Sequence, residues 1–293
     1  MLVEVRAASV NPVDVRRRTR PTRLPKTTGS DLAGVVTAVG EGVETFGEGD
    51  RVFATGLHAS RFAGGSCADY AVVPTDVGAP LPASVTFEDG AAIALVGVTA
   101  WRALVHRAAL EPGSTVLVHG GNGGVGHVAV GPADAMGATV VATARPTYHE
   151  AIREIGAETV LDYRRDDLVE AIHDVAGGVD VVLDHRPEQY LATDVDVAEF
   201  DGNVVLYAGS DASLPGLSTA RSKNLAIYMM SMTNLATHRD MPDIGPILER
   251  VGRLLAADRL EVRVDRTYPL EATTDAKRTV TDKSVLGKVV VLP

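Results

Sequence analysis

The chain has 293 residues, of which 45% are hydrophobic and 23% charged, a balance typical of a folded globular protein. Its formal net charge of −10 at pH 7 argues against nucleic acid and anionic membranes as partners. A single cysteine, Cys67, excludes an internal disulfide and a cysteine-based structural zinc site.

No segment reaches the roughly 18 apolar residues of a membrane helix. The first residues carry acidic side chains and lack the apolar block of a signal peptide, so the cytoplasm is the expected location. The chain has 23 Arg but only 5 Lys, and 23 of its 38 acids are Asp. An acidic, lysine-poor surface stays soluble where salt screens charge, which makes halophilic origin a hypothesis. A GC-rich genome is the alternative explanation of the arginine bias.

Short strands are predicted over the first ninety residues or so. Residues 2–10 alternate apolar and polar side chains with a period of two. Runs of β-branched residues bounded by glycine and aspartate follow at 31–40, 49–55 and 68–74. Because turn residues recur at short intervals, this region is predicted to form a small barrel-like or curved-sheet domain.

From about residue 95, strands and helices are predicted to alternate, which indicates βαβ units and a parallel sheet. The predicted strands are 114–120, 138–144, 158–163, 179–184 and 202–209. Helices are predicted at 147–157 and 166–178, with a further helix after a glycine-rich turn; the segment between 184 and 202 is expected to be a loop. Pro132 predicts a kink or a shortening of that further helix, because proline lacks the backbone N–H.

The C-terminal region continues with a helix at 244–260, a strand at 261–270, a helix at 273–283 and a closing strand at 287–293. No low-complexity linker separates these elements from the rest. We therefore expect residues 1–95 and 236–293 to form one domain, with residues 96–235 inserted as another.

The strongest local motif is G-x-G-x-x-G, formed by Gly121, Gly123 and Gly126 between a predicted strand and a predicted helix. Glycines there allow a tight turn, close approach of backbone to a pyrophosphate, and close packing of helix on strand. Free N–H groups and the helix dipole then hold the phosphates. In this βαβ context the motif predicts dinucleotide binding, with a plain glycine-rich turn as the alternative.

The end of the second strand of this unit indicates which dinucleotide is bound. An NAD site places Asp or Glu there to accept the ribose hydroxyls. This chain has Arg145, whose guanidinium pairs with a 2′-phosphate, and Tyr148 and Tyr163 can add hydroxyl contacts. NADPH is the predicted cofactor; the alternative is that Arg145 is a solvated loop residue.

Segments along the whole chain resemble the medium-chain dehydrogenase/reductase superfamily, specifically its quinone oxidoreductase (zeta-crystallin-like) branch. The matching segments are VRAASVNPVDVR, GSDLAGVVTAVGEGVETFGEGDRVFA, GSCADYAVVP, AAIALVGVTAWRAL, VLVHGGNGGVG, GAETVLDYR, VDVVLD and GKVVVLP. The resemblance implies an α/β fold, in which a Rossmann doubly wound parallel sheet is inserted in a GroES-like β-rich catalytic domain. It also implies an active site in the cleft between domains, NADPH as hydride donor, and a homo-oligomer, with a dimer expected.

The resemblance also implies roles for individual residues. Thr99 matches the threonine of a T-A motif beside the nicotinamide and phosphates. Gly123, Gly124, Val125 and Gly126 match the G-G-V-G phosphate loop.

Zinc-dependent relatives have a cysteine where Asn11 stands, and Gly-His-Glu where Gly29, Ser30 and Asp31 stand. No metal is therefore expected. Without one, Asn11 is the candidate catalytic residue, donating an amide N–H to the developing oxyanion; the alternative is that it only caps a turn with Pro12. Asp14 is expected to bond backbone N–H groups in the same loop.

The chain departs from the family after Asp14, where the family carries cleft tyrosines and this chain has an arginine cluster between Arg16 and Arg23. The cluster fits a solvated loop, an anion site such as one for a CoA phosphate, or, against the net charge, a nucleic-acid contact. The family also begins upstream of this Met1 with a β-hairpin.

Three functions remain open from the sequence. The first is hydride transfer from NADPH to a quinone or a similar conjugated carbonyl. The second is reduction of an enone or an enoyl-thioester on the same scaffold. The third is a non-catalytic NADPH-binding protein.

Overall fold

The computed structural model describes residues 1–16, 26–57, 64–209, 211–235, 237–238, 241, 243–282 and 285–293. The chain divides into two compact units: the first combines Met1–Val98 with Met232–Pro293, and the second is Thr99–Ser231. The first boundary, between Val98 and Thr99, lies inside helix α2 (Phe87–Trp101).

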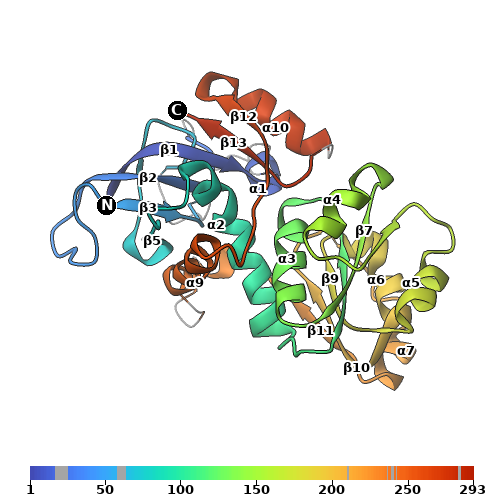
Figure 1. The fold of residues 1–293 in the computed structure, drawn as a ribbon. Coiled ribbons are helices and arrows are strands. Elements are labelled where there is room, and N and C mark those ends of the chain that lie inside the picture. Colours follow the sequence, from blue (N-terminus) through green and yellow to red (C-terminus); the bar gives the residue numbers. More distant parts are fainter. Residues whose placement is uncertain are drawn as a thin grey trace. The chain divides into compact units, whose positions relative to one another are not determined.

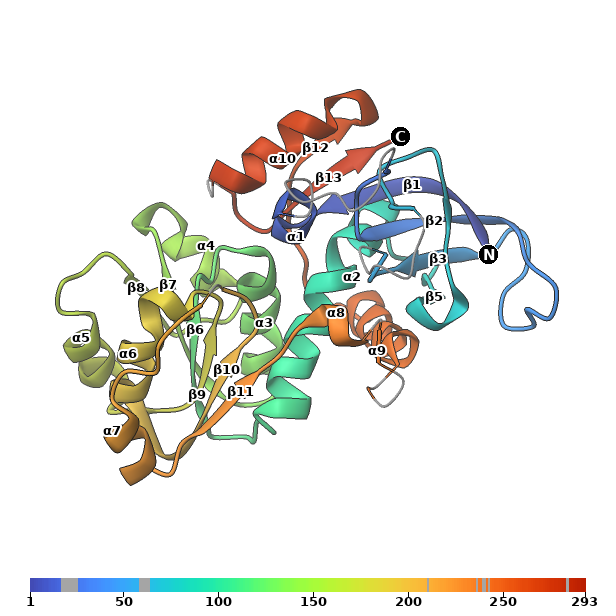
Figure 2. The same cartoon turned by 180° about the vertical axis from the view of Figure 1, so that it is seen from behind.

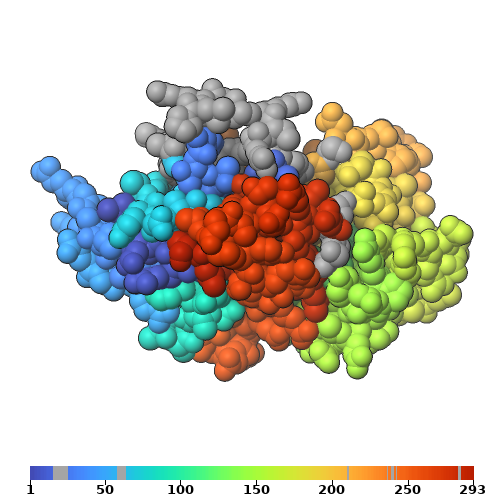
Figure 3. All heavy atoms as spheres, turned by 90° about the horizontal axis from the view of Figure 1, so that it is seen from above, coloured from blue at the N-terminus to red at the C-terminus, as the bar shows by residue number. Residues whose placement is uncertain are grey.

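The first unit is built on a mainly antiparallel sheet whose described strands run in the order β12-β13-β1-β2-β3-β5, with β4 also paired to β1 (Figure 1). The strands are β1 (Leu2–Val10), β2 (Asp31–Ala38), β3 (Arg51–Ala54), β4 (Tyr70–Val72), β5 (Gly78–Pro80), β12 (Val264–Pro269) and β13 (Lys288–Leu292). Strand β1 lies between a strand from each half of this unit, so that Ala8 pairs with Val291 and Ser9 with Asp31. Figure 3 shows the result on one face, where the red C-terminal residues pack against blue N-terminal ones.

Helices close the core of this unit because their apolar residues recur at helical spacing. They are α1 (Pro12–Arg16), α2, α8 (Met232–Leu235), α9 (Ile244–Ala256) and α10 (Thr273–Asp282). Helix α9 buries Ile244, Ile247, Leu248 and Val251, positions that share one face, and packs against β5. Helix α10 packs on β12 and β13 through Ala276.

The second unit contains a parallel sheet with the described strand order β11-β10-β9-β6-β7-β8. Its strands are β6 (Thr115–His119), β7 (Thr139–Ala144), β8 (Thr159–Asp162), β9 (Val179–Asp184), β10 (Ala198–Leu206) and β11 (Ala226–Met229). Every pairing in it is parallel, and the interior strands β6 and β9 are buried on both faces, as their continuous apolar runs predict. The predicted doubly wound sheet is therefore confirmed.

Helices cover both faces of this sheet, as Figure 1 and the reverse view in Figure 2 show. They are α3 (Gly124–Ala135), α4 (His149–Glu154), α5 (Leu168–Ala176), α6 (Pro187–Val197) and α7 (Leu217–Ser222). Helices α3 and α4 pack against β6, β7 and β8, whereas α6 lies between α5 and α7 and packs against β9 and β10. A cluster that includes Leu117, Ile172, Leu191 and Val204 fills the space under α5 and α6.

One local prediction is corrected by the structure. The segment predicted as a loop after residue 184 contains helix α6, which begins at Pro187. Of the two effects predicted for Pro132, the shortening is not seen, because α3 continues to Ala135 and closes with a hydrogen bond from Met136 N–H to Pro132 C=O at 2.9 Å. The kink stays a prediction. Across the part of the chain that is described, no helix combines the length and apolarity needed to span a bilayer.

Candidate functional site

The candidate dinucleotide site of the second unit lies at the carboxyl ends of β6 and β9. These neighbouring strands are followed by helices on opposite faces of the sheet, α3 after β6 and α6 after β9. Such a switch point leaves a crevice at the carboxyl edge, which is where open α/β sheets bind ligands.

The glycine-rich turn after β6 is shaped by close backbone packing. Gly120 has φ of +70°, and a Cβ on it would lie 2.6 Å from Cε1 of His185. A Cβ on Gly126 would lie 2.2 Å from the carbonyl oxygen of Gly120, so only glycine fits that first turn of α3. The turn is anchored by a 2.9 Å hydrogen bond from Gly121 N–H to Thr143 C=O on the neighbouring strand.

The first turn of α3 supplies the donors that a pyrophosphate needs. Gly123 is the N-cap, and no side chain in the described part of the chain caps the helix there. The N–H groups of Gly124, Val125 and Gly126 therefore have no intrahelical acceptor. Their donors and the positive end of the helix dipole fit an anionic phosphate.

The residues predicted to hold a 2′-phosphate are brought together beyond β7. Arg145 is half-buried, and its Nε donates to the hydroxyl oxygen of Tyr163 at 3.3 Å. Tyr148 N–H donates to the Arg145 carbonyl at 2.9 Å. The carboxylate of Asp162, at the end of β8, accepts two hydrogen bonds from the Arg164 guanidinium, at 3.0 and 2.7 Å, so it does not neutralise Arg145. The chemistry of this donor set fits a phosphate.

Thr99 begins the second unit and is 3% exposed, on α2. It belongs to a helix rather than to the glycine turn. Its proposed contact with the cofactor remains a prediction.

In the first unit, Asn11 lies at the centre of a buried polar network and is 2% exposed. Its Nδ2 donates to Asp31 at 2.7 Å and to Ser30 at 3.3 Å. Its Oδ1 accepts from Lys288 Nζ at 2.5 Å. The whole carboxamide is thus engaged, and donation to a substrate would require the longer bond, to Ser30, to be given up.

Lys288 supplies the positive charge of this network. Its Nζ also donates to the Val10 carbonyl at 3.2 Å, and its side chain is buried. Burial lowers the pKa of Lys288, while the nearby carboxylates of Asp31 and Asp14 oppose that shift. Burial likewise raises the pKa of Asp31, opposed by the Lys288 ammonium. The charges compensate one another in the core.

Asp14 has the backbone-bonding role expected of it, because it accepts the Asn11 N–H at 2.9 Å. It also accepts from the Ser30 hydroxyl at 2.9 Å. Burial, and then the charge of Asp31, raise its pKa to about 6. The arginines at 17, 18, 20 and 23 and the side chain of Arg16 lie outside the described residues.

Sequence reasoning did not find a second buried polar cluster, beneath the glycine turn. It contains His119, Asp184 and Asp194, all 0% exposed. Asp184 ends β9, and an acid at the carboxyl end of a strand next to a glycine motif is a signal that could have identified it. Asp194 gave no signal, because it lies in the segment predicted as a loop.

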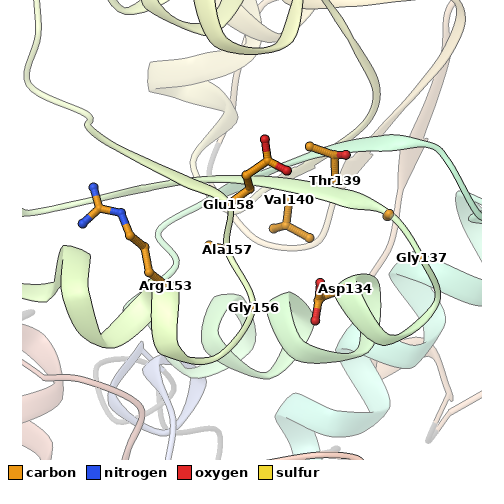
Figure 4. Close-up of a pocket in the computed structure, with 9 residues that line it drawn as sticks. Asp134, Gly137, Thr139, Val140, Arg153, Gly156, Ala157 and Glu158 are labelled. Atoms are coloured by element: carbon orange, nitrogen blue, oxygen red, sulfur yellow. The ribbon is translucent and has the colours of Figure 1, made fainter.

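A separate depression of about 390 Å³ lies at the opposite edge of the sheet, where β7 and β8 begin (Figure 4). Its polar side chains are those of Asp134, Thr139, Arg153 and Glu158. Because it is at the amino ends of the strands, it is distinct from the dinucleotide site. Among the residues described, no group of three or more His, Cys, Asp or Glu side chains is arranged to hold a metal ion.

Comparison with known proteins now adds to this geometry. Residues 1–83 match the alcohol dehydrogenase GroES-like domain, and residues 155–291 match a domain described as zinc-binding dehydrogenase. Quinone oxidoreductase of Lama guanicoe is 32% identical over all of this chain and 88% of that protein. The human quinone oxidoreductase is 30% identical over the same shares.

Solved structures agree in fold. The Escherichia coli quinone oxidoreductase in complex with NADPH superimposes with a TM-score of 0.87 at 28% identity, over 100% of this chain and 91% of that one. The Coxiella burnetii quinone oxidoreductase gives a TM-score of 0.86 at 26% identity, over 100% of this chain and 90% of that one. These similarities identify the chain as an NAD(P)-dependent oxidoreductase. It belongs to the medium-chain dehydrogenase/reductase superfamily, in its quinone oxidoreductase branch.

Proposed function

We propose that this enzyme uses NADPH, without zinc, to reduce a quinone or a similar conjugated carbonyl. The observation that carries the choice of cofactor is the pairing of Arg145 with Tyr163 where an NAD site would place an acid. The NADPH complex of the Escherichia coli relative supports the same choice.

When bound, NADPH supplies a hydride. The protein would bind and orient this cofactor: the N–H groups of Gly124, Val125 and Gly126 would donate to the pyrophosphate, and Arg145, Tyr148 and Tyr163 would hold the 2′-phosphate. Thr99 is proposed to lie beside the nicotinamide. These contacts act on the cofactor rather than on the carbonyl, so they do not select the substrate.

Asn11 is the proposed donor to the substrate oxygen. Lys288 and Asp31 fix both ends of its carboxamide, so one N–H keeps its direction while the 3.3 Å bond to Ser30 is exchanged for a substrate. A preorganised donor of this kind stabilises a developing oxyanion. An amide polarises a carbonyl less than a metal ion does, which favours acceptors that take hydride readily.

Zinc independence is proposed from the chemistry of the same residues. Asn11 and Ser30 are neutral and lack the imidazole and thiolate ligands that zinc prefers. The Lys288 ammonium, bonded to Asn11, brings a cation into the network, which further disfavours a metal ion beside Asp31.

A homodimer is also proposed. Strand β11 is one edge of the six-stranded sheet among the described residues, and Met229 on it is 81% exposed. An uncovered edge strand with an exposed apolar side chain favours pairing with a second copy.

The proposed reaction is tested by initial rates of NADPH oxidation in high salt. The panel contains a benzoquinone, a naphthoquinone, a 2-alkenal and crotonyl-CoA, each before and after treatment with a chelator. We expect turnover with the quinones that survives chelation. Turnover restricted to crotonyl-CoA would favour the enoyl-thioester alternative, and loss of activity on chelation would contradict zinc independence.

A further inference from the structure

The buried cluster beneath the glycine turn joins three strands and one helix. His119 ends β6, Thr143 lies in β7, Asp184 ends β9, and Asp194 comes from α6. All four side chains are 0% exposed. The His119 ring also stacks on Tyr190 of α6, with centroids 4.2 Å apart and planes 3° from parallel.

A chain of hydrogen bonds connects this cluster to the glycine turn. Gly120 N–H donates to Thr143 Oγ1 at 3.2 Å, and Thr143 Oγ1 lies 3.1 Å from His119 Nδ1. His119 Nε2 lies 3.0 Å from Asp194 Oδ1. One assignment satisfies each group: the threonine hydroxyl donates to Nδ1, and Nε2–H donates to Asp194.

The two carboxyl groups lie close together, and each has an oxygen without a donor. After the larger effect of burial, the charge of Asp194 is near enough to raise the pKa of Asp184. Asp184 Oδ1 accepts the Arg186 backbone N–H at 2.6 Å, but no donor in the described part of the chain reaches Asp184 Oδ2 or Asp194 Oδ2. One proton held between the carboxyl groups supplies the missing donor.

No lysine or arginine side chain among the described residues compensates this pair. The groups that face it from the surrounding elements are His119, Thr143, His185, Tyr190, Tyr207 and the backbone of Arg186. The Arg186 guanidinium lies 3.7 Å from Glu188, where both side chains are 35% exposed. Burial raises the pKa of Asp184 and Asp194, and burial lowers the pKa of His119 to about 4. A neutral imidazole and a singly charged acid pair are therefore the favoured state.

We propose that Asp184 and Asp194 share a proton and, through His119 and Thr143, position the phosphate loop, so that dinucleotide affinity depends on the protonation of the pair. This inference rests on the proposed dinucleotide site. Asp184, Asp194 and His119 are then positioning residues, because they act through the loop and not on the cofactor itself.

The sign of the dependence follows from charge. Loss of the shared proton places a second negative charge, in a medium of low dielectric, beneath the turn that receives the pyrophosphate. It also removes the donor that holds the carboxyl groups together. NADPH affinity is therefore expected to fall as pH rises, by at most about tenfold per pH unit for one proton.

The test measures the Kd of NADPH by fluorescence titration from about pH 6 to about pH 9, a range that spans the raised carboxyl pKa. The variant is Asp194→Asn, whose amide can donate to Asp184 while its oxygen accepts from His119, so it mimics the protonated pair at every pH. The matched control is Asp196→Asn, an exposed position on the same helix. A parallel titration with NADH removes the contribution of the 2′-phosphate, which itself titrates near pH 6.

We expect the wild type and the Asp196→Asn variant to lose affinity with rising pH, whereas Asp194→Asn keeps a nearly constant Kd for both cofactors. Identical pH profiles for all three proteins would overturn the inference. Absence of NADPH and NADH binding at every pH would instead overturn the proposed function, together with the coupling inferred from it.

A second measurement, without cofactor, tests the shared proton itself. Because burial raises the carboxyl pKa above the unfolded value, the pair stabilises the fold at low pH, and this contribution declines between about pH 4 and the raised pKa. Urea unfolding should therefore show a steeper decline with pH in the wild type than in Asp194→Asn. Parallel declines would show that no proton is shared.

Discussion

Arg145 and Lys288 are cations in different surroundings, and this difference determines what each can do. Arg145 is half-buried and bonded to a tyrosine hydroxyl, so its charge remains available to an anion. Lys288 is 3% exposed and hydrogen-bonded to Asn11 and Val10, so its charge is held inside the core. Arg145 is therefore suited to binding an anion, and Lys288 to compensating buried acids.

Replacing Arg145 by glutamate tests the choice of cofactor. The new carboxylate can accept from ribose hydroxyls but repels a 2′-phosphate, so the Kd of NADPH should rise about tenfold or more while that of NADH stays constant or falls. Isothermal titration with both cofactors measures this. Arg165→Glu is the matched control, since Arg165 is exposed and bonded to Asp167. An unchanged preference for NADPH would refute the role of Arg145.

Replacing Lys288 by methionine tests the charge compensation around Asp31. Removing one partner of a buried charged network leaves the other uncompensated, which costs about 3–5 kcal/mol of unfolding free energy. Without the cation the pKa of Asp31 rises further, so the loss should be smaller at about pH 5 than at about pH 8. Urea unfolding at the two pH values measures it, with the exposed Lys26→Met as control. Equal losses at both pH values would show that Asp31 does not depend on Lys288.

At the scale of elements, strands with a clear period were predicted closely and one helix was missed. The alternation in residues 2–10 predicts β1, Leu2–Val10, because each polar position is also a solvent-facing or hydrogen-bonded one. Helix α6 was missed because its sequence, PEQYLATDVDV, is rich in β-branched residues and aspartate, which have low helix propensity. Pro187 at its first turn is a start signal that the sequence did contain.

Some residues of the candidate site could be predicted from local sequence, and others could not. The glycine turn and Arg145 are local in sequence and were predicted from spacing alone. The Asp184–Asp194–His119 cluster depends on α6 crossing the carboxyl end of β9, a tertiary contact that no local pattern encodes. The bonding of Lys288 to Asn11 joins residues 277 positions apart, so it was also beyond local reasoning.

Strand β11 gives the element-scale prediction. Met229→Lys places a charge at the exposed edge, which opposes strand pairing between copies. Light scattering after size exclusion should show a dimer for the wild type and a monomer for the variant. Leu217→Lys, at a position 66% exposed on α7, is the control and should remain dimeric. A dimeric Met229→Lys protein would contradict an interface at β11.

For the whole molecule, the dominant feature is its acidic balance. The net charge is −10. Some acids are paired locally with arginines, for example Asp162 with Arg164 and Asp275 with Arg278. Such exposed pairs contribute little stability individually, so the unpaired acids leave a repulsion that salt can screen.

Salt dependence tests the halophile hypothesis. If repulsion among acids limits stability, the unfolding free energy should be higher in about 2 M KCl than in about 0.1 M KCl, where the Debye length is near 10 Å. Urea unfolding in the two solutions measures the difference. A sucrose solution of equal osmolality controls for preferential exclusion. Equal unfolding free energies in the two salt solutions would contradict the hypothesis and leave genome composition as the reason for the arginine bias.

The position of β1 between β2 and β13 also has a consequence for synthesis on the ribosome. The second unit is one continuous segment, Thr99–Ser231, and can fold as soon as that segment has emerged. The first unit, in contrast, must keep part of one edge of β1 open until Lys288–Leu292 arrives, because β4 covers only the Leu2–Glu4 part of that edge. During that interval the nascent chain exposes the strand edge at Ala8, Ser9 and Val10, which makes the first unit the part of the newly synthesised protein most prone to aggregate.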